Sequence, residues 1–150
     1  MKVSISLLAV ALPCAFSMAG ETVPVVPFAK VMNPAFAKDY QDKQISTTVK
    51  FIAAGQTEGY MWGAIPKSAI KGKVPFRVVA PGESVPVGLG NIPPHVFIEK
   101  AASDLVFELK NGDEIILIGH TVVGKMFLSN FSQIVFVADS ISSATPIPKN

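Results

Sequence analysis

The chain has 150 residues, a length that supports one domain. Apolar residues make up 49% of the sequence and charged residues 16%, which provides for a packed core and excludes an intrinsically disordered protein. The formal net charge is only +2, so the chain has no general electrostatic attraction for nucleic acid, and nucleic acid is not an expected partner.

Residues 1–19 have the pattern of a secretory signal peptide. Lys2 provides a basic start, the apolar run 6–12 is too short to span a bilayer, and Ser17-Met18-Ala19 places small residues where a signal peptidase requires them. We therefore expect cleavage after Ala19 and a periplasmic or secreted mature chain without a transmembrane helix. The alternative is an uncleaved anchor.

Cys14 is the only cysteine and lies inside this leader. The residues before it, Ala11-Leu12-Pro13, fit a lipoprotein signal poorly. The mature chain is then expected to have no disulfide, no thiolate nucleophile and no zinc–sulfur site.

Residues 20–39 are expected to form an extended arm that lies against the body of the protein. The segment contains Pro24, Pro27 and Pro34, which cannot donate hydrogen bonds to a sheet. Asn33-Pro34 also favours a short helical turn that leads to Tyr40.

The segments that follow predict short strands separated by loops. Gln44 to Gly55 alternates apolar and polar side chains and predicts the first strand. Val74 to Ala80 predicts the second strand, ended by the turn pair Pro81-Gly82, and His95 to Glu99 predicts the third. The segments 56–73 and 82–94 are interpreted mainly as loops, although Tyr60, Trp62 and Ala64 alternate as in a strand.

A short helix is expected over Lys100 to Lys110, capped at Ser103-Asp104 and stopped by Asn111-Gly112. A hairpin is then predicted within Gly112 to Asp139. Its first strand contains Ile115 to Ile118, and its turn is placed at Thr121 to Lys125, with a break at Val123-Gly124-Lys125.

The second strand of the hairpin is predicted from Met126 onward, with a bulge at Ser132-Gln133. Valines exposed at the predicted turn would indicate a protein contact, whereas buried valines would cap the barrel. Residues 140–150 are expected to form a flexible tail.

The predicted order of three strands, a helix and two strands is that of an OB-fold, a five-stranded Greek-key barrel. Tyr40-Gln-Asp-Lys43 before the first strand, and Leu109-Lys-Asn-Gly-Asp113 before Ile115–Gly119, resemble the YxGK and L…GDxVxVxG stretches of bacterial exported OB-fold proteins, of the secreted bacterial and tRNA-anti-like types. The resemblance covers roughly residues 40–138 and implies a mainly β binding module, with the barrel domain predicted over residues 40–139. Gln41-Asp42 departs from it by replacing a small or Gly-containing turn.

No catalytic, metal or cofactor site is expected. The two histidines, His95 and His120, lie on separate predicted strands and lack the spacing of a ligand pair. Asp113 and Glu114 point to opposite sides of a strand, and no serine lies in a strand-to-helix elbow. An enzyme is therefore the least supported class.

The candidate ligand-binding group combines aromatic and basic side chains near the loop between the first two strands. Aromatic rings stack on flat ligands, and basic groups meet anions. Its members are Tyr60, Trp62, Lys67, Lys71 and Arg77, with Lys73 beside them. The competing interpretation is that the rings pack in the core and the lysines are solvated.

Two hypotheses follow for the function. The first is an exported OB-fold binding or interaction module whose small ligand or protein partner contacts Tyr60, Trp62 and Arg77. The second is a structural or accessory envelope protein that docks on a partner through its proline-rich arm or the 82–94 loop.

Export provides the first test. We expect protein secreted by a bacterial host to begin at Gly20, because small residues at 17 and 19 satisfy signal peptidase. Intact-mass spectrometry of the exported chain checks this, and exported protein that begins at Met1 would contradict it.

Overall fold

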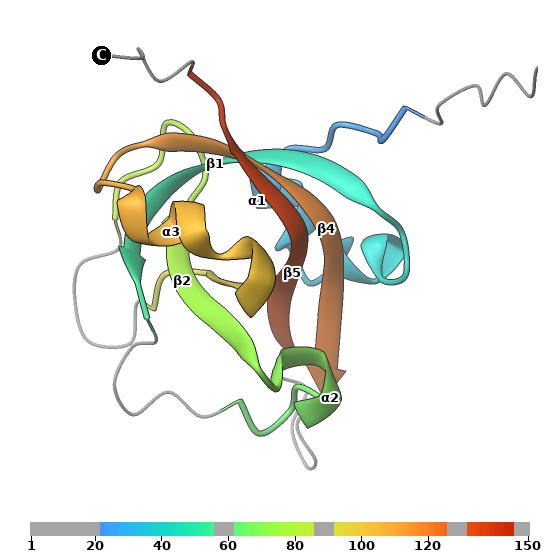
Figure 1. Cartoon of the computed structure of the whole chain (residues 1–150). Helices are drawn as coiled ribbons and strands as arrows, with labels where there is room; N and C mark the ends of the chain where they lie inside the picture. Colours follow the sequence, from blue (N-terminus) through green and yellow to red (C-terminus); the bar gives the residue numbers. More distant parts are fainter. Residues whose placement is uncertain (1–21, 56–61, 86–91, 126–131, 146–150) are drawn as a thin grey trace, which may run out of the picture.

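The computed structural model describes residues 22–55, 62–85, 92–125 and 132–145. In these ranges the chain is mainly β. Its strands are β1 (Ile45–Ala54), β2 (Lys73–Val79), β3 (His95–Glu99), β4 (Glu114–Lys125) and β5 (Ser132–Ser143). They close into a barrel in the order β1-β2-β3-β5-β4, with β4 returning to β1 (Figure 1). The predicted closed five-stranded barrel is confirmed, and its strand order fits an OB-fold-like barrel.

The helices of the described ranges are all short. They are α1 (Phe28–Val31), η1 (Ala37–Tyr40), α2 (Lys67–Ile70), η2 (Lys100–Ala102) and α3 (Asp104–Glu108). Between β3 and β4, η2 and α3 replace the longer helix expected over 100–110. Ser103 does not cap α3 with its side chain; its hydroxyl donates instead to the carbonyl oxygen of Lys100, at 2.8 Å.

The first three strands follow the predicted patterns. In β1, Ile45, Thr47, Val49 and Phe51 are buried and the residues between them are half-buried, as alternation requires. β3 has the predicted bounds, and β2 begins and ends one residue earlier than expected. β3 pairs in parallel with β5, whereas the other neighbouring strands pair antiparallel.

The barrel interior is closed partly by residues from outside the sheet. Val106 of α3 and Phe28 and Val31 of α1 are buried in the same core as the inward-facing strand residues. Phe28 meets Phe136 of β5 edge to face, with ring centroids 6.4 Å apart. The arm is therefore not simply extended, because α1 inserts two side chains into the core.

Two further contacts fasten the arm to the barrel. Upstream of α1, the N–H of Ser46 donates to the oxygen of Pro24 (2.8 Å), and the N–H of Val26 donates to the oxygen of Ser46 (2.9 Å). Downstream, the buried hydroxyl of Thr121 on β4 donates to the oxygen of Ala37, at 2.6 Å. Residues 24–37 are thus held against both β1 and β4.

The structure corrects the predicted hairpin. Thr121 to Lys125 lies inside β4, so neither a turn nor a break occurs there. The register shift of the β4–β5 pair lies between Ile118 and Gly119, whereas Gln133 and Ser132 pair regularly with Gly124 and Lys125. Residues 126–131 lie outside the described ranges.

The end of the chain also differs from the expectation. β5 continues to Ser143, so residues 140–143 belong to the sheet rather than to a flexible tail. Residues 146–150 lie outside the described ranges, as do the expected leader and Cys14. Within the parts that are described, no helix is both long and apolar enough to cross a membrane.

Asp42 explains how the chain departs from the turn that the resemblance implies. Its φ is 64°, in the left-handed region that glycine enters most easily. Aspartate tolerates this region better than most residues do, so Asp42 makes the turn before Lys43 without a glycine.

Gly119 allows the β4–β5 register shift, because a Cβ there would lie 2.0 Å from the backbone oxygen of Val137. We expect Gly119→Ala to lower the free energy of unfolding by roughly 1–3 kcal/mol, since the contacting atoms are backbone and cannot move aside cheaply. Gly63→Ala is the matched control, because nothing lies within 4 Å of its added Cβ. Urea denaturation measures both, and equal stability of the two variants would contradict the assignment.

Candidate functional site

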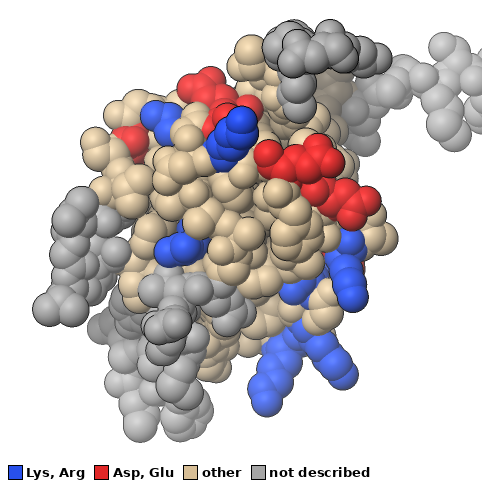
Figure 2. All heavy atoms as spheres, turned by 60° about the vertical axis from the view of Figure 1, so that its left-hand side comes forward, with Lys and Arg blue, Asp and Glu red and all other residues tan. Residues whose placement is uncertain are grey.

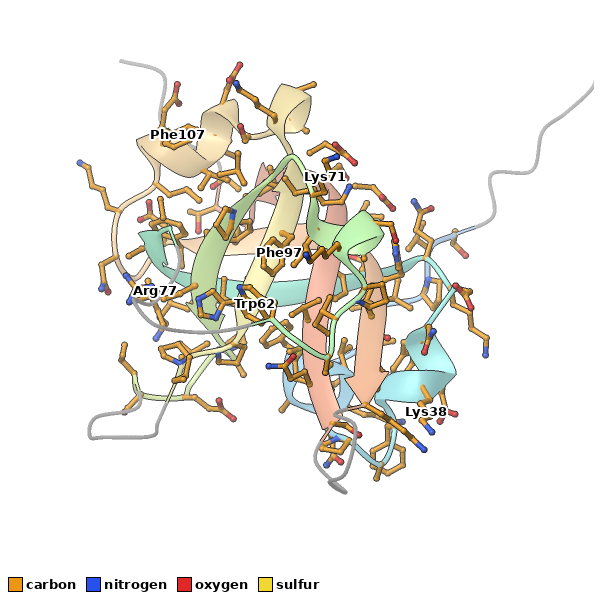
Figure 3. The ribbon with its side chains drawn as sticks, turned by 90° about the horizontal axis from the view of Figure 1, so that it is seen from below. Lys38, Trp62, Lys71, Arg77, Phe97 and Phe107 are labelled. Atoms are coloured by element: carbon orange, nitrogen blue, oxygen red, sulfur yellow. The ribbon has the colours of Figure 1, made fainter. Side chains whose placement is uncertain are left out.

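The outer face of the barrel is covered where β3 and β5 pair. Val96 and Phe136 face the interior, so their neighbours Phe97, Val135 and Val137 face outward; yet these three are buried. They pack beneath the segment 62–72, which carries α2 across the strands (Figure 3). The residues of this segment in the contact are Trp62, Ile65, Ala69 and Ile70.

The backbone at Ala64 fixes this segment in place. Its N–H donates to Oε1 of the buried Gln133 on β5, at 2.9 Å. A Cβ at Gly124 of β4 would lie 1.8 Å from the oxygen of Ala64, so only glycine permits this close approach. Gln133 and Gly124 are register partners, and together they define where the segment crosses the sheet.

Trp62 is half-buried by two aromatic contacts. Its ring meets His95 edge to face at a centroid distance of 4.8 Å, and meets Phe97 in the same way at 5.1 Å. Trp62 is therefore both a packing residue and a wall of the space beside it. Because it is half-buried, Trp62 is not a freely exposed ring on which a flat ligand could stack.

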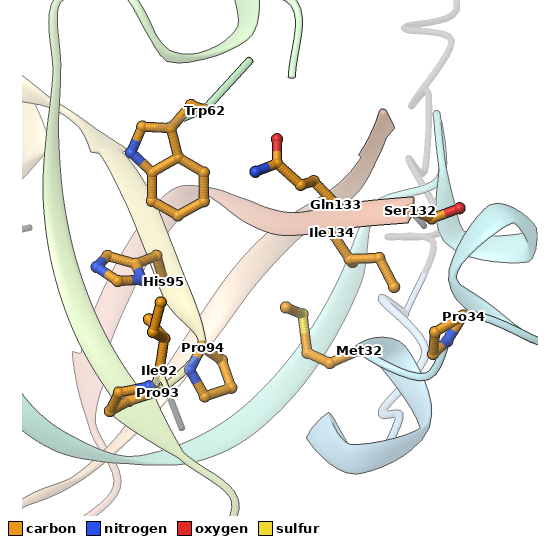
Figure 4. Close-up of a pocket in the computed structure, with 10 residues that line it drawn as sticks. All are labelled: Met32, Pro34, Trp62, Ile92, Pro93, Pro94, His95, Ser132, Gln133 and Ile134. Atoms are coloured by element: carbon orange, nitrogen blue, oxygen red, sulfur yellow. The ribbon is translucent and has the colours of Figure 1, made fainter. Parts of the chain in front are cut away.

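Beside Trp62 lies a pocket of about 220 Å³ (Figure 4). Four segments far apart in the sequence form its walls: the arm, the Trp62 segment, the residues that lead into β3, and the start of β5. The lining residues are Met32, Pro34, Trp62, Ile92, Pro93, Pro94, His95, Ser132, Gln133 and Ile134. The walls are mainly apolar, and the ten residues include neither a carboxylate nor a lysine.

His95 is held uncharged at neutral pH. Its side chain is 2% exposed. Burial and the nearby positive charge of Arg77 lower its pKa from 6.5 to about 4, against a hydrogen bond with the backbone of Pro93 that favours the charged form. Arg77 faces His95 directly across the β2–β3 ladder. Trp62, His95 and Arg77 therefore lie in one row on the outer face.

The structure brings together only some of the residues expected to bind ligand. Trp62 and Arg77 are linked through His95, whereas Lys67 and Lys71 are exposed at the two ends of α2, and Figure 3 shows Lys71 apart from the other two. Tyr60 lies outside the described residues. Lys73 forms an ion pair with Glu99 of β3, so it already has a charged partner.

Charged side chains are unevenly spread on the face drawn in Figure 2. Acidic groups gather in its upper part, and a group of basic side chains projects at its lower end. Uncharged residues occupy most of the surface between them. This mixed surface agrees with the small net charge and presents no continuous basic groove on that face.

The polar side chains that line the pocket belong to His95, Ser132 and Gln133, beside the indole of Trp62. Among the described residues, no three His, Cys, Asp or Glu side chains are grouped so as to hold a metal ion. A scan against models of protein families finds no match, and a search of curated proteins finds none either.

Sequence reasoning missed most of the pocket wall. Met32 and Pro34 belong to the arm, and Ile92 to Pro94 belong to a segment interpreted as a loop. Gln133 carried a signal, because it is a polar residue at an outward position of an apolar strand. From the sequence alone this position predicts a bulge, whereas in the structure the Gln133 side chain accepts a hydrogen bond from the backbone of Ala64.

The lowered pKa of His95 predicts a pH-dependent stability. Between pH 6.5 and about 4, His95 is protonated in the unfolded chain but not in the folded chain. The free energy of unfolding therefore falls as the pH is lowered through this window. The shift corresponds to a loss on the order of 3 kcal/mol. Urea denaturation at several pH values across this window measures the loss in the wild type. In His95→Gln this pH-dependent loss should be absent.

The control for this experiment is His120→Gln, which leaves His95 in place and should therefore show the same pH-dependent loss of stability as the wild type. An unchanged pH dependence in His95→Gln would contradict the assignment.

Proposed function

We propose that the protein is a non-catalytic binding module of OB-fold-like architecture that receives a compact, mainly apolar group of its ligand in the Trp62 pocket. The observation that carries the proposal is the convergence of four distant segments on one small apolar space. Its volume of about 220 Å³ is below the roughly 300–1,000 Å³ of pockets that enclose a complete drug-sized ligand. A single side chain or ring of a larger partner suits it better.

Arg77 gives the proposed ligand a preferred charge. Its Nε is buried and has no hydrogen-bond partner among the described residues. The neighbouring His95 is uncharged at neutral pH, so Arg77 supplies the positive charge of the Trp62–His95–Arg77 row. Arg77 does not line the pocket itself, but it faces His95, which does, so its positive charge favours an anionic group on the ligand. The ligand would therefore carry a carboxylate or a similar anion beside its apolar group.

Export supports a ligand of the cell envelope or its surroundings. The leader predicted for residues 1–19 would take the chain to the periplasm or beyond, where nucleic acid is not the usual partner. A small metabolite or the anchor side chain of an envelope protein has the required size.

Trp62 reports directly on this proposal because it is the only tryptophan of the chain. We expect N-acetyl-phenylalanine and N-acetyl-leucine to change its fluorescence in a saturable manner. The matching uncharged amides should bind roughly threefold to tenfold more weakly, because they lack the anion that meets Arg77. Arg77→Gln should abolish this preference, whereas Phe107→Ala, on the exposed face of α3, should keep it.

A folded protein whose Trp62 emission none of these probes changes would overturn the proposed site. If the wild type bound the N-acetyl amino acids and their amides with equal affinity, the proposed pocket would stand, but the role of Arg77 would be rejected.

A further inference from the structure

One backbone position on β1 has open hydrogen-bonding groups. Ser46 exchanges hydrogen bonds with Pro24 and Val26 of the arm, and Lys50 pairs with Val79 of β2. The N–H and C=O of a strand alternate between its two sides, so those of Thr48 point the same way as those of Ser46, away from β4. Among the described residues, neither group has a hydrogen-bond partner on that side.

Two prolines explain the opening. Continuing the β1–β2 register brings Pro81 opposite Thr48, and proline has no N–H to donate. Gly82 follows with a φ of 84°, and the N–H of Glu83 bonds back to the oxygen of Ala80, so the chain turns away. On the other flank, Pro27 is the N-cap of α1, so the arm leaves its pairing with β1 there and enters the helix.

A second pocket, of about 500 Å³, lies at this opening. Its lining residues are Val25, Val26, Pro27, Phe28, Ala29, Thr48, Ala80, Pro81 and Glu83. Most are apolar, and Val25 is 79% exposed although its neighbours hold it against β1. Among the described residues that line it, Glu83 alone is charged. The lining includes residues of both segments that the sequence suggested for docking: five from the arm, and Glu83 from the 82–94 loop.

We propose that this pocket binds a segment of a protein partner through one residue that pairs its backbone with Thr48 and buries an apolar side chain. A peptide residue matches both open groups of Thr48 at once, because its C=O accepts from the N–H and its N–H donates to the C=O. A purely apolar molecule would leave both groups unsatisfied.

The neighbours of Thr48 define the shape of the partner. The arm occupies the edge of β1 at Ser46, and β2 occupies it at Lys50, so the opening admits the backbone of one residue. The partner therefore crosses the edge as a bend or a chain end and does not add a complete strand. Glu83 at the rim favours a basic residue next to the buried apolar one.

Hydrogen exchange followed by NMR tests the premise in the free protein. The amide of Thr48 should exchange at least roughly tenfold faster than those of Thr47 and Val49, which point toward β4. Protection of Thr48 equal to that of its neighbours would overturn the proposal.

A blocked tripeptide, acetyl-alanyl-leucyl-lysine amide, then serves as the probe for binding at millimolar concentration. We expect it to shift the Thr48 amide resonance and slow its exchange. A version methylated on the leucine nitrogen, a version with alanine in place of leucine and a version with glutamate in place of lysine should each bind at least roughly threefold more weakly.

Variants of the protein complete the test. Val25→Asp and Glu83→Gln both alter exposed side chains, so the fold should persist, and each should weaken the probe by roughly threefold to tenfold. Phe107→Asp changes an exposed apolar residue that does not line the pocket and should leave binding unchanged.

Several outcomes would reject the proposal. Binding of the methylated peptide as tightly as the parent would show an apolar pocket without backbone pairing. Resonance shifts on adding the peptide that are confined to Trp62 and His95 would place it in the Trp62 pocket instead. Protection of Thr48 that rises with protein concentration alone would identify a second copy of the chain as the occupant.

Discussion

The contact between the backbone of Ala64 and the bare Cα of Gly124 sets the arrangement of the outer face. It allows the segment 62–72 to lie so close to the sheet that Gln133 reaches the N–H of Ala64. Trp62 is then carried onto His95 and Phe97, and both faces of β3 become buried. The wall of the Trp62 pocket and the uncharged state of His95 both depend on this coverage.

How far the sequence predicts the fold depends on whether a pattern is local. The alternation from Ile45 to Phe51 and the apolar run His95 to Glu99 record burial within one strand, and both are found as predicted. Gly124 is different, because a glycine within an apolar run predicts a break in the strand when only the local sequence is considered. Its actual role is a contact with Ala64, sixty positions earlier in the chain, and no local rule contains that information.

The same distinction separates the parts of the site that were found from those that were missed. Trp62 and Arg77 stand out by residue type alone. Met32 and Pro34 become a pocket wall only when α1 docks in the core through Phe28 and Val31. His95 and Gln133 occupy outward positions that normally face water, and they are buried only because another segment covers them.

The arm contributes to two separate spaces. Val25 to Ala29 line the pocket at Thr48, and Met32 and Pro34 line the pocket at Trp62. Between them, α1 is a single turn whose side chains Phe28 and Val31 are both buried. A molecule that displaced this turn on entering one space would also move a wall of the other. Occupancy of the two would then show heterotropic linkage, with equal and reciprocal effects on the two affinities.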